Sequence, residues 1–110
     1  MTNALLALLL ALGIISTPDM VREMATREGV NPALAACIVT NESNWDPHLV
    51  SKDKDTGLFQ IIPSTAKWVA EQMGLQSYDL MDPVTNAEMG TWILKRYPEW
   101  YSTMYLCEGK

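Results

Sequence analysis

The stretch TNESNWDPHLVSKDKDTGLFQI, residues 40–61, decides the fold and holds the strongest functional signal in the chain. The segment before it, PALAACIV at residues 32–39, is apolar on every side and predicts a central helix. That helix runs directly into Glu42, after which a proline, a glycine and an aperiodic charged run predict a turn-rich loop. The run GLFQI, residues 57–61, predicts a short extended segment where this loop ends.

Helical patterns surround this loop on both sides. Thr17 can cap a helix in which Pro18 takes the first position, and Asn31 can cap the apolar helix. The fold class is therefore mainly α, with one irregular loop or short β segment in the middle. Apolar spacing and helix stop signals predict helices over residues 18–28, 32–43, 63–73, 82–97 and 99–107.

The composition excludes several classes of function. The 110 residues suffice for one small domain, which we expect to be a monomer. The net charge is −5 without a cluster of Lys or Arg, so we expect neither nucleic-acid binding nor a basic membrane-binding surface. A single histidine and the lack of a C-x-x-C motif leave too few ligands for a metal site. We expect no cofactor.

Residues 1–16 differ from the rest of the chain. The run ALLALLLALGII, residues 4–15, carries no charge and is shorter than the roughly 20 residues needed to span a bilayer. It has the length of a signal-peptide core, although no Lys or Arg precedes it and no A-x-A site follows. We favour an export signal for residues 1–16, followed by one domain over residues 17–110. An apolar helix that packs on the domain is the alternative, and membrane contact would occur only through an uncleaved N-terminal segment.

Two cysteines, Cys37 and Cys107, leave two interpretations open. In an exported protein they can pair and close a loop of about 70 residues, which is worth roughly 4 kcal/mol in the chain-entropy model. As buried thiols they would behave as small hydrophobic side chains.

Glu42 has the setting of a catalytic acid. A carboxyl group at the end of a buried helix is costly to ionise, and the negative helix terminus adds to that cost. Both effects raise the pKa of a carboxyl group toward neutral pH, where a general acid works. An isolated glutamate at this place would instead point into water, so the interpretation depends on its neighbours in the sequence.

Glu42-Ser43 is followed by an aromatic residue, Asp-Pro, a serine, Gly-Leu-Phe-Gln, a proline and Thr-Ala. This order resembles the soluble lytic transglycosylase domain, a relative of goose-type lysozymes. In that family Gly-Leu-Met-Gln stands where this chain has Gly-Leu-Phe-Gln. Upstream, GVNPALAACIVTNES is similar to the family's helix that leads to its catalytic glutamate. The resemblance covers most of residues 18–97, and its positions after Ser43 are Trp45-Asp46-Pro47, Ser51, residues 57–61, Pro63, Thr65-Ala66, Asp82-Pro83, Asn86 and Gly90.

The resemblance implies a lysozyme-like α fold whose groove binds the glycan strands of peptidoglycan. Glu42 would protonate the bond between N-acetylmuramic acid and N-acetylglucosamine, and its carboxylate would then take the proton of the muramoyl 6-hydroxyl as a 1,6-anhydro ring closes. Such a protein would be exported to the periplasm or cell wall and be encoded by a bacterium or phage. Residues that match positions for orienting the glutamate or holding the sugar are Ser43, Ser51, Phe59 and Gln60, and both serines can alternatively cap loop backbone.

The chain departs from the family pattern at three places. Asp55 precedes Gly57 by two residues, which is similar to c-type lysozymes, and retaining glycosidases place two carboxyls about 5–5.5 Å apart. Asp55 is therefore either a second catalytic carboxyl of a muramidase or a solvated turn residue. The family's closing Ala-Tyr-Asn-Ala-Gly is replaced by YLCEG, where Tyr105 serves only with a shift of one residue. The sequence stops at Lys110, where the family continues with another helix.

Three functions fit these patterns: a lytic transglycosylase, a muramidase that hydrolyses the same bond, and a glycan-binding module that has lost its chemistry.

Five aromatic residues after position 90 are expected in the core, although some can line a groove because sugars stack on aromatic faces.

Overall fold

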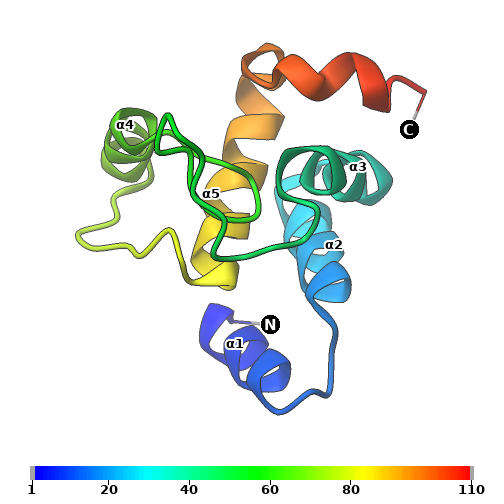
Figure 1. Cartoon of the computed structure of the whole chain (residues 1–110). Coiled ribbons are helices and arrows are strands. Elements are labelled where there is room, and N and C mark those ends of the chain that lie inside the picture. The colour runs from blue at the N-terminus through cyan, green and yellow to red at the C-terminus, as the bar shows by residue number, and fades with distance from the viewer. Residues whose placement is uncertain (1, 110) are drawn as a thin grey trace.

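The computed structural model describes residues 2–109, which form the mainly α fold that the sequence predicts (Figure 1). Short 3-10 helices, η1 and η2, follow the last α-helix. In chain order the elements are α1 (Asn3–Ala11), α2 (Thr17–Glu28), α3 (Pro32–Ser43), α4 (Pro63–Met73), α5 (Pro83–Arg96), η1 (Pro98–Trp100) and η2 (Ser102–Cys107).

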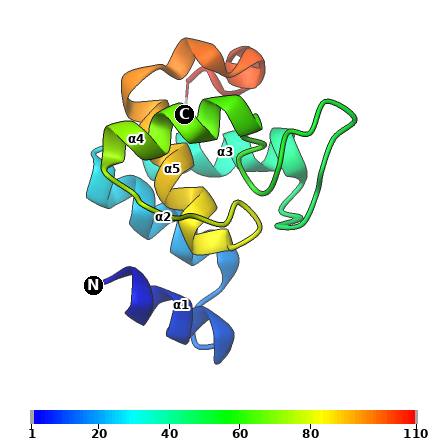
Figure 2. The ribbon, with the colours of Figure 1, turned by 90° about the vertical axis from the view of Figure 1, so that its left-hand side faces the viewer.

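Helix α5 forms the axis of the core. In Figures 1 and 2 it lies between α4 on one side and α2 on the other, while α3 crosses α2 and meets η2. The prediction that the 32–43 helix is central is therefore wrong, because α3 packs on α2 and η2 rather than filling the middle of the core. Its buried residues are Ala35, Ile38, Val39 and Ser43, whereas α5 buries Val84, Asn86, Ala87, Met89, Gly90, Thr91, Ile93 and Leu94.

The ends of the helices agree with their sequence signals to within a residue. Helix α2 begins with Ser16 as its cap, one residue before the predicted Thr17, and Asp19 completes a reciprocal capping box. Asn31 caps α3 as predicted, through a hydrogen bond from the Ala33 backbone N–H to its side-chain oxygen (2.9 Å).

The middle loop, residues 44–62, is fastened to the core by one buried side chain. Thr56 forms isolated antiparallel bridges with Val50 and Ile61, so the predicted extended segment 57–61 is in fact a turn between bridge residues. Asn86, fully buried on α5, accepts a hydrogen bond from the Phe59 backbone N–H (2.8 Å). Its amide donates to the carbonyls of Thr56 and Leu80, each at 2.9 Å. Asn86 therefore pairs the Phe59 N–H and the Leu80 carbonyl and adds a second hydrogen bond to the Thr56 carbonyl, which also accepts from the Ile61 N–H.

Two glycines allow this loop to approach α5. Gly57 has a φ of +80°, and a Cβ there would lie 2.2 Å from the Asn86 amide nitrogen. At Gly90 a Cβ would lie 2.2 Å from the Phe59 ring, so glycine allows the ring to rest directly on the helix backbone. Both glycines belong to the motif that the sequence analysis singled out. The structure shows that glycine is needed at these two positions because a side chain would collide with Asn86 or Phe59.

The C-terminal segment differs from its prediction. The expected helix over residues 99–107 is two short 3-10 helices, because α5 ends at Arg96 and Pro98 prevents its continuation. Tyr101, between η1 and η2, is buried, whereas Tyr105 is 68% exposed. A disulfide between Cys37 and Cys107 ties the end of η2 to α3.

Helix α1 lies against the rest of the domain. Leu6 is fully buried, and α1 contacts α2 and α5. In this conformation residues 3–11 are thus the packed apolar helix that the sequence analysis kept as an alternative, although Leu5, Leu8 and Leu12 remain exposed. The export-signal interpretation stays a prediction. Within residues 2–109, none of the helices combines the length and apolar character needed to cross a membrane.

Candidate active site

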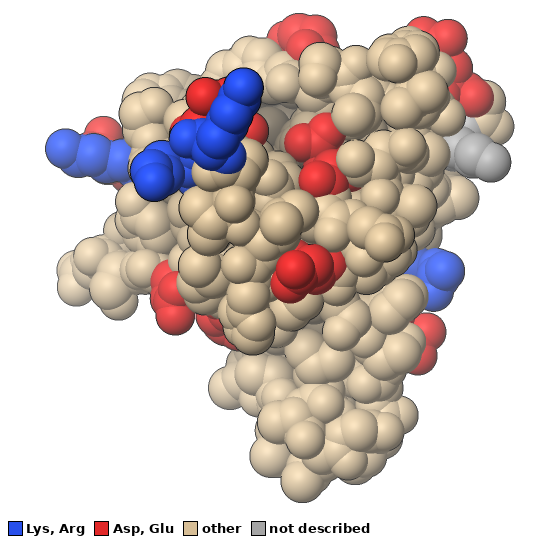
Figure 3. Space-filling model, viewed as in Figure 1, with Lys and Arg blue, Asp and Glu red and all other residues tan. Residues whose placement is uncertain are grey.

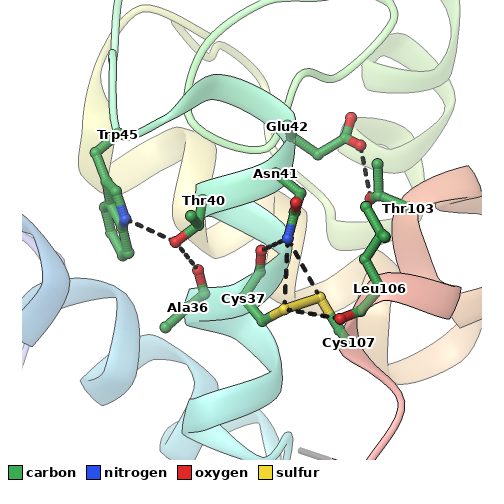
Figure 4. Close-up of a disulfide and its surroundings, with 9 residues drawn as sticks. All are labelled: Ala36, Cys37, Thr40, Asn41, Glu42, Trp45, Thr103, Leu106 and Cys107. Carbon is green, nitrogen blue, oxygen red and sulfur yellow. Dashed lines mark hydrogen bonds between the residues drawn. A yellow bond between two sulfur atoms is a disulfide. The ribbon is translucent and has the colours of Figure 1, made fainter.

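Glu42 lies in the last turn of α3, half-buried, at the point where the chain leaves the helix. Asn44 ends α3 in the left-handed conformation (φ 50°), which turns the chain away from the helix axis. Glu42 Oε2 accepts a hydrogen bond of 2.7 Å from the hydroxyl of Thr103 on η2, while its other oxygen points away from Thr103 (Figure 4). One carboxyl oxygen is thus held and the other is free to act.

The surroundings raise the pKa of Glu42 above its usual value. Burial is the largest cause, because it disfavours the charged carboxylate, and the charge of Asp55 acts in the same direction. The hydrogen bond from Thr103 opposes them by stabilising the carboxylate. A carboxyl group in this balance keeps a proton at higher pH than a solvated glutamate does, and can still ionise.

Asp55 lies close enough to Glu42 for its charge to raise the Glu42 pKa. Its backbone N–H donates to Ser51 Oγ (3.1 Å), and its carbonyl accepts from the Ser51 N–H (2.9 Å). Its Oδ1 is buried and has no hydrogen-bond partner among residues 2–109. Oδ1 of Asp55 is thus shielded from water although the residue as a whole is only half-buried, and both interpretations of Asp55 stay predictions.

Tyr101 is the tyrosine beside the glutamate. Its side chain is buried, and its hydroxyl donates to the Phe59 carbonyl (3.1 Å). Burial raises the pKa of Tyr101 far above its usual range, and the charge of Glu42 raises it further. Tyr101 thus stays a neutral hydroxyl while Glu42 changes its protonation state.

Two adjacent hollows lie on the surface, and Tyr101 lines the first of them, whereas Glu42 and Asp55 line neither. The first has a volume of about 270 Å³ and the second about 390 Å³, and they share Thr65 and Trp100. Aliphatic, aromatic, hydroxyl and amide side chains form their walls, and the aromatic faces and neutral polar groups suit neutral sugar rings. Acidic side chains are spread over the face seen in Figure 3, whereas Lys and Arg lie mainly at its upper left, with a smaller basic group at the right edge. The first hollow is lined by Gln60, Ile61, Ile62, Thr65, Ile93, Trp100 and Tyr101, and the second by Ser64, Thr65, Trp68, Tyr97 and Trp100.

Most of the aromatic residues beyond position 90 form one cluster at this place. Tyr97 and Trp100 stack with ring centroids 4.3 Å apart, and Trp68 meets both at 5.9 Å. Trp92 completes the cluster, and the Arg96 guanidinium lies 4.3 Å from the centre of its ring. The expectation that these residues fill the core is only partly right, since Trp100 is 47% exposed.

The polar residues singled out by the sequence form hydrogen bonds mainly with backbone groups. Ser43 is buried, and its hydroxyl donates to the Val39 carbonyl (3.2 Å), so it does not reach the hollow. Ser51 holds the backbone of Asp55, as described above. Gln60 lines the first hollow, but its amide donates to the carbonyls of Leu49 and Gly57, each at 3.0 Å. Capping of loop backbone, the alternative for both serines, describes Ser51, whereas Ser43 bonds to the backbone of its own helix.

One assignment to ligand binding is corrected by the structure. Phe59 is fully buried between Gly90 and Tyr101, so its ring has no surface to offer a ligand. Tyr105 is exposed on η2, and its assignment stays a prediction. The buried Tyr101 is the tyrosine whose pKa the charge of Glu42 raises.

Sequence reasoning missed the hydroxyl that contacts Glu42. Thr103 lies 61 positions after Glu42 and belongs to no recognisable motif. For Tyr101 a signal exists, an aromatic pair at residues 100–101, but the pattern does not distinguish it from Tyr105. Cys37 and Cys107 form a disulfide, one of the two alternatives left open. A search of residues 2–109 finds no group of three or more metal-ligating side chains.

Comparison with known proteins places the chain in a family. Residues 19–107 match the family model described as the transglycosylase SLT domain. The chain is 35% identical over 82 residues to the membrane-bound lytic murein transglycosylase C of Edwardsiella ictaluri, covering 66% of this chain and 22% of the relative. It is 30% identical over 77 residues to the soluble lytic murein transglycosylase of Escherichia coli K12, covering 66% of this chain and 12% of the relative.

A solved structure supports the same relationship. The 70 kDa soluble lytic transglycosylase of Escherichia coli superposes with a TM-score of 0.66 at 27% identity, covering 76% of this chain and 14% of that protein. The lysozyme-like helical fold expected from the sequence is thereby confirmed. This chain spans less than a quarter of the length of each of these relatives. With the family model matching most of its length, the chain belongs to the transglycosylase SLT domain family.

Proposed function

We propose that this protein cleaves the β-1,4 bond between N-acetylmuramic acid and N-acetylglucosamine in peptidoglycan, with formation of a 1,6-anhydro ring. The observation that carries the proposal is Glu42, a half-buried carboxyl with a raised pKa whose charge acts on Tyr101, a residue that lines the first hollow. The printed names of the relatives, lytic murein transglycosylases, support the same reaction.

In this mechanism Glu42 acts twice. Its protonated form gives its proton to the glycosidic oxygen, and the bond to the muramoyl anomeric carbon breaks. The resulting carboxylate takes the proton of the muramoyl 6-hydroxyl, whose oxygen attacks the anomeric carbon and closes the ring. The substrate's own N-acetyl group stabilises the cation between the steps, so a second protein carboxylate is not required. The opposing effects of burial and Thr103 on the Glu42 pKa suit a group that must hold a proton and then release it.

Glycan strands of peptidoglycan are the proposed partner, bound by the chain as a monomer. The two adjacent hollows offer an aromatic wall at Trp68, Tyr97 and Trp100 on which sugar rings can stack. We place the activity in the periplasm or cell wall of a bacterium, or in a phage that attacks it. The disulfide supports this placement, because such bonds persist in oxidising compartments.

The products of digestion test the proposal. Purified peptidoglycan is incubated with the protein, and the released muropeptides are analysed by mass spectrometry. Fragments lighter by one water than the hydrated form would carry the anhydro end and are the expected result. Hydrated reducing ends would show hydrolysis instead. Binding to peptidoglycan without any released fragment would show a module that has lost its chemistry.

Asp55 gives the muramidase alternative a specific basis. Its buried, unpartnered Oδ1 and its charge on Glu42 are what a second catalytic carboxyl would show. If Glu42 works alone, Asp55→Asn should keep kcat within about threefold. The alkaline limb of its pH–rate profile should move to lower pH, since removing the Asp55 charge lowers the Glu42 pKa. A loss of about 100-fold together with hydrated products would make Asp55 part of a hydrolytic mechanism. Asp53→Asn, two residues earlier and exposed, is the matched control.

A further inference from the structure

Two links join η2 to the end of α3, and Figure 4 shows them together. The disulfide connects Cys37 on α3 to Cys107 on η2, with their Cα atoms 5.8 Å apart. The second link is the hydrogen bond of 2.7 Å from the Thr103 hydroxyl to Glu42 Oε2. Asn41, between the two links, donates its amide to the Cys37 carbonyl (2.9 Å) and lies 3.8 Å from the Cys107 sulfur.

The spacing of the two links is matched along both elements. Cys37 and Glu42 are five residues apart on an α-helix, which corresponds to about 7.5 Å at 1.5 Å per residue. Thr103 and Cys107 are four residues apart on a 3-10 helix, which corresponds to about 8 Å at 2.0 Å per residue. The two elements run antiparallel, since Cys37 pairs with the later residue of η2 and Glu42 with the earlier one. Closing the disulfide therefore sets the register in which Thr103 meets Glu42.

Besides these two links, η2 is held by the packing of Met104, which is partly buried against the core. This element is a six-residue 3-10 helix without a side-chain cap, and Cys107 is its buried residue. Tyr105 and Leu106 are 68% and 48% exposed. At the near end, Tyr101 is anchored through its hydroxyl to the Phe59 carbonyl. Short 3-10 segments are not stable by themselves, so the position of Thr103 depends on the anchors on either side of it.

We infer that Thr103 is a positioning residue for Glu42, and that the Cys37–Cys107 disulfide holds it in place. The inference rests on the proposed function, in which Glu42 is the general acid and base. By occupying Oε2, Thr103 leaves the other carboxyl oxygen to carry the proton that is transferred. The disulfide thus acts on catalysis through Thr103, without contacting substrate itself.

The groups around Glu42 give the sign of the effect. Burial and the charge of Asp55, from the middle loop, raise the Glu42 pKa, and Thr103 is the neighbour that lowers it. Tyr101, between η1 and η2, stays neutral because its own pKa is far above the usual range. Loss of the Thr103 hydroxyl should therefore raise the Glu42 pKa further. Activity that needs protonated Glu42 would then persist to higher pH, while its maximum rate falls.

The first test compares Thr103→Val, Thr103→Ser and the control Ser102→Ala, an exposed neighbour on η2. Thr103→Val should lower kcat by about tenfold with little change in KM, and move the alkaline limb of the pH–rate profile upward. Thr103→Ser keeps the hydroxyl and should stay within about threefold of the wild type. An unshifted pH profile for Thr103→Val, or a serine variant as poor as the valine variant, would overturn the role of Thr103.

The second test removes the disulfide with the pair Cys37→Ala/Cys107→Ala, after circular dichroism has shown that the variant is folded at the assay temperature. We expect the same direction of change in kcat and in the pH profile. Adding Thr103→Val to this double variant should lower kcat much less than Thr103→Val lowers it in the wild type, because the two changes act through one contact. If the effects of the two changes on kcat were fully additive, the disulfide would not act through Thr103. Reduction of the wild type by dithiothreitol, which gives two protons and two electrons to the bond, should reproduce the effect.

A direct titration separates this inference from the proposed function. The pKa of Glu42 is followed by NMR of the side-chain carboxyl carbon in the wild type and each variant, without substrate. A higher Glu42 pKa in Thr103→Val and in the cysteine pair is expected whether or not the wild type cleaves peptidoglycan. An inactive wild type with these shifts would overturn the proposed function alone, whereas unchanged pKa values would overturn the inference.

Discussion

Glu42→Gln should remove essentially all release of muropeptides from peptidoglycan, with a fall in kcat of about 10²–10⁴-fold. The amide has the shape of the carboxyl and can still accept the hydrogen bond from Thr103, but it cannot give a proton to the glycosidic oxygen. Binding to peptidoglycan should be unchanged, because Glu42 is not among the residues that line the first hollow. The measurement is the initial rate of fragment release, with a sedimentation assay for binding.

Glu88 provides a matched control for this experiment. It is also a half-buried glutamate whose pKa is raised by burial, but it lies on α5 and its charged neighbours are Arg27 and Glu28. Glu88→Gln should therefore leave the rate within about twofold. A Glu42→Gln protein that retains more than a tenth of the wild-type rate would contradict its role as general acid. Equal losses in both variants would point to a general effect of removing a buried carboxyl.

Asn86→Ala should be the most destabilising single change in the domain, by about 3–5 kcal/mol. It would leave the buried Phe59 N–H without a partner and remove the hydrogen bonds to the carbonyls of Thr56 and Leu80, of which the Thr56 carbonyl keeps its bond from the Ile61 N–H. It would also open a cavity under the middle loop. The midpoint of thermal unfolding should fall by more than about 10 °C. Because this loop carries Asp55 and the wall of the first hollow, activity should be lost at temperatures where the helices persist.

Thr85→Ala, one residue earlier on α5, is a graded comparison for Asn86→Ala. Its hydroxyl makes a single, partly buried hydrogen bond to Asp82 (2.7 Å) near the helix start. The expected loss in free energy of unfolding is about 1 kcal/mol. If Asn86→Ala proved no worse than Thr85→Ala, the loop would be held by packing of Leu58 and Phe59, and the amide would be incidental.

The sequence predicted those parts of the molecule that depend on local rules. Helix starts at proline and asparagine and helix ends at glycine follow from capping chemistry, and they lie within a residue of their predicted places. The position of Glu42 at the end of α3 follows from the same rules. The resemblance to the family identified Asn86 and Gly90 as special, but their physical role became visible only in the contacts with the middle loop.

The rest depends on contacts between distant segments. Local sequence rules do not distinguish Tyr101 from Tyr105. Tyr101 is buried at the start of η2, whereas Tyr105, within this 3-10 helix, is exposed. Phe59 matched a family motif that the sequence analysis assigned to ligand binding, yet the absence of a side chain at Gly90 draws its ring into the core. Thr103 meets Glu42 because of a disulfide whose existence the sequence left open.

The covalent link between α3 and η2 also affects how the molecule must be made. Its two cysteines are 70 positions apart, so they meet only after the intervening loop and helices have collapsed, and oxidation should follow the formation of the core. With two cysteines in the whole chain, only one intramolecular pairing exists. Maturation of a single molecule therefore calls for an oxidant but not for an isomerase, and a chain oxidised too early forms a dimer with a neighbour rather than a mispaired monomer.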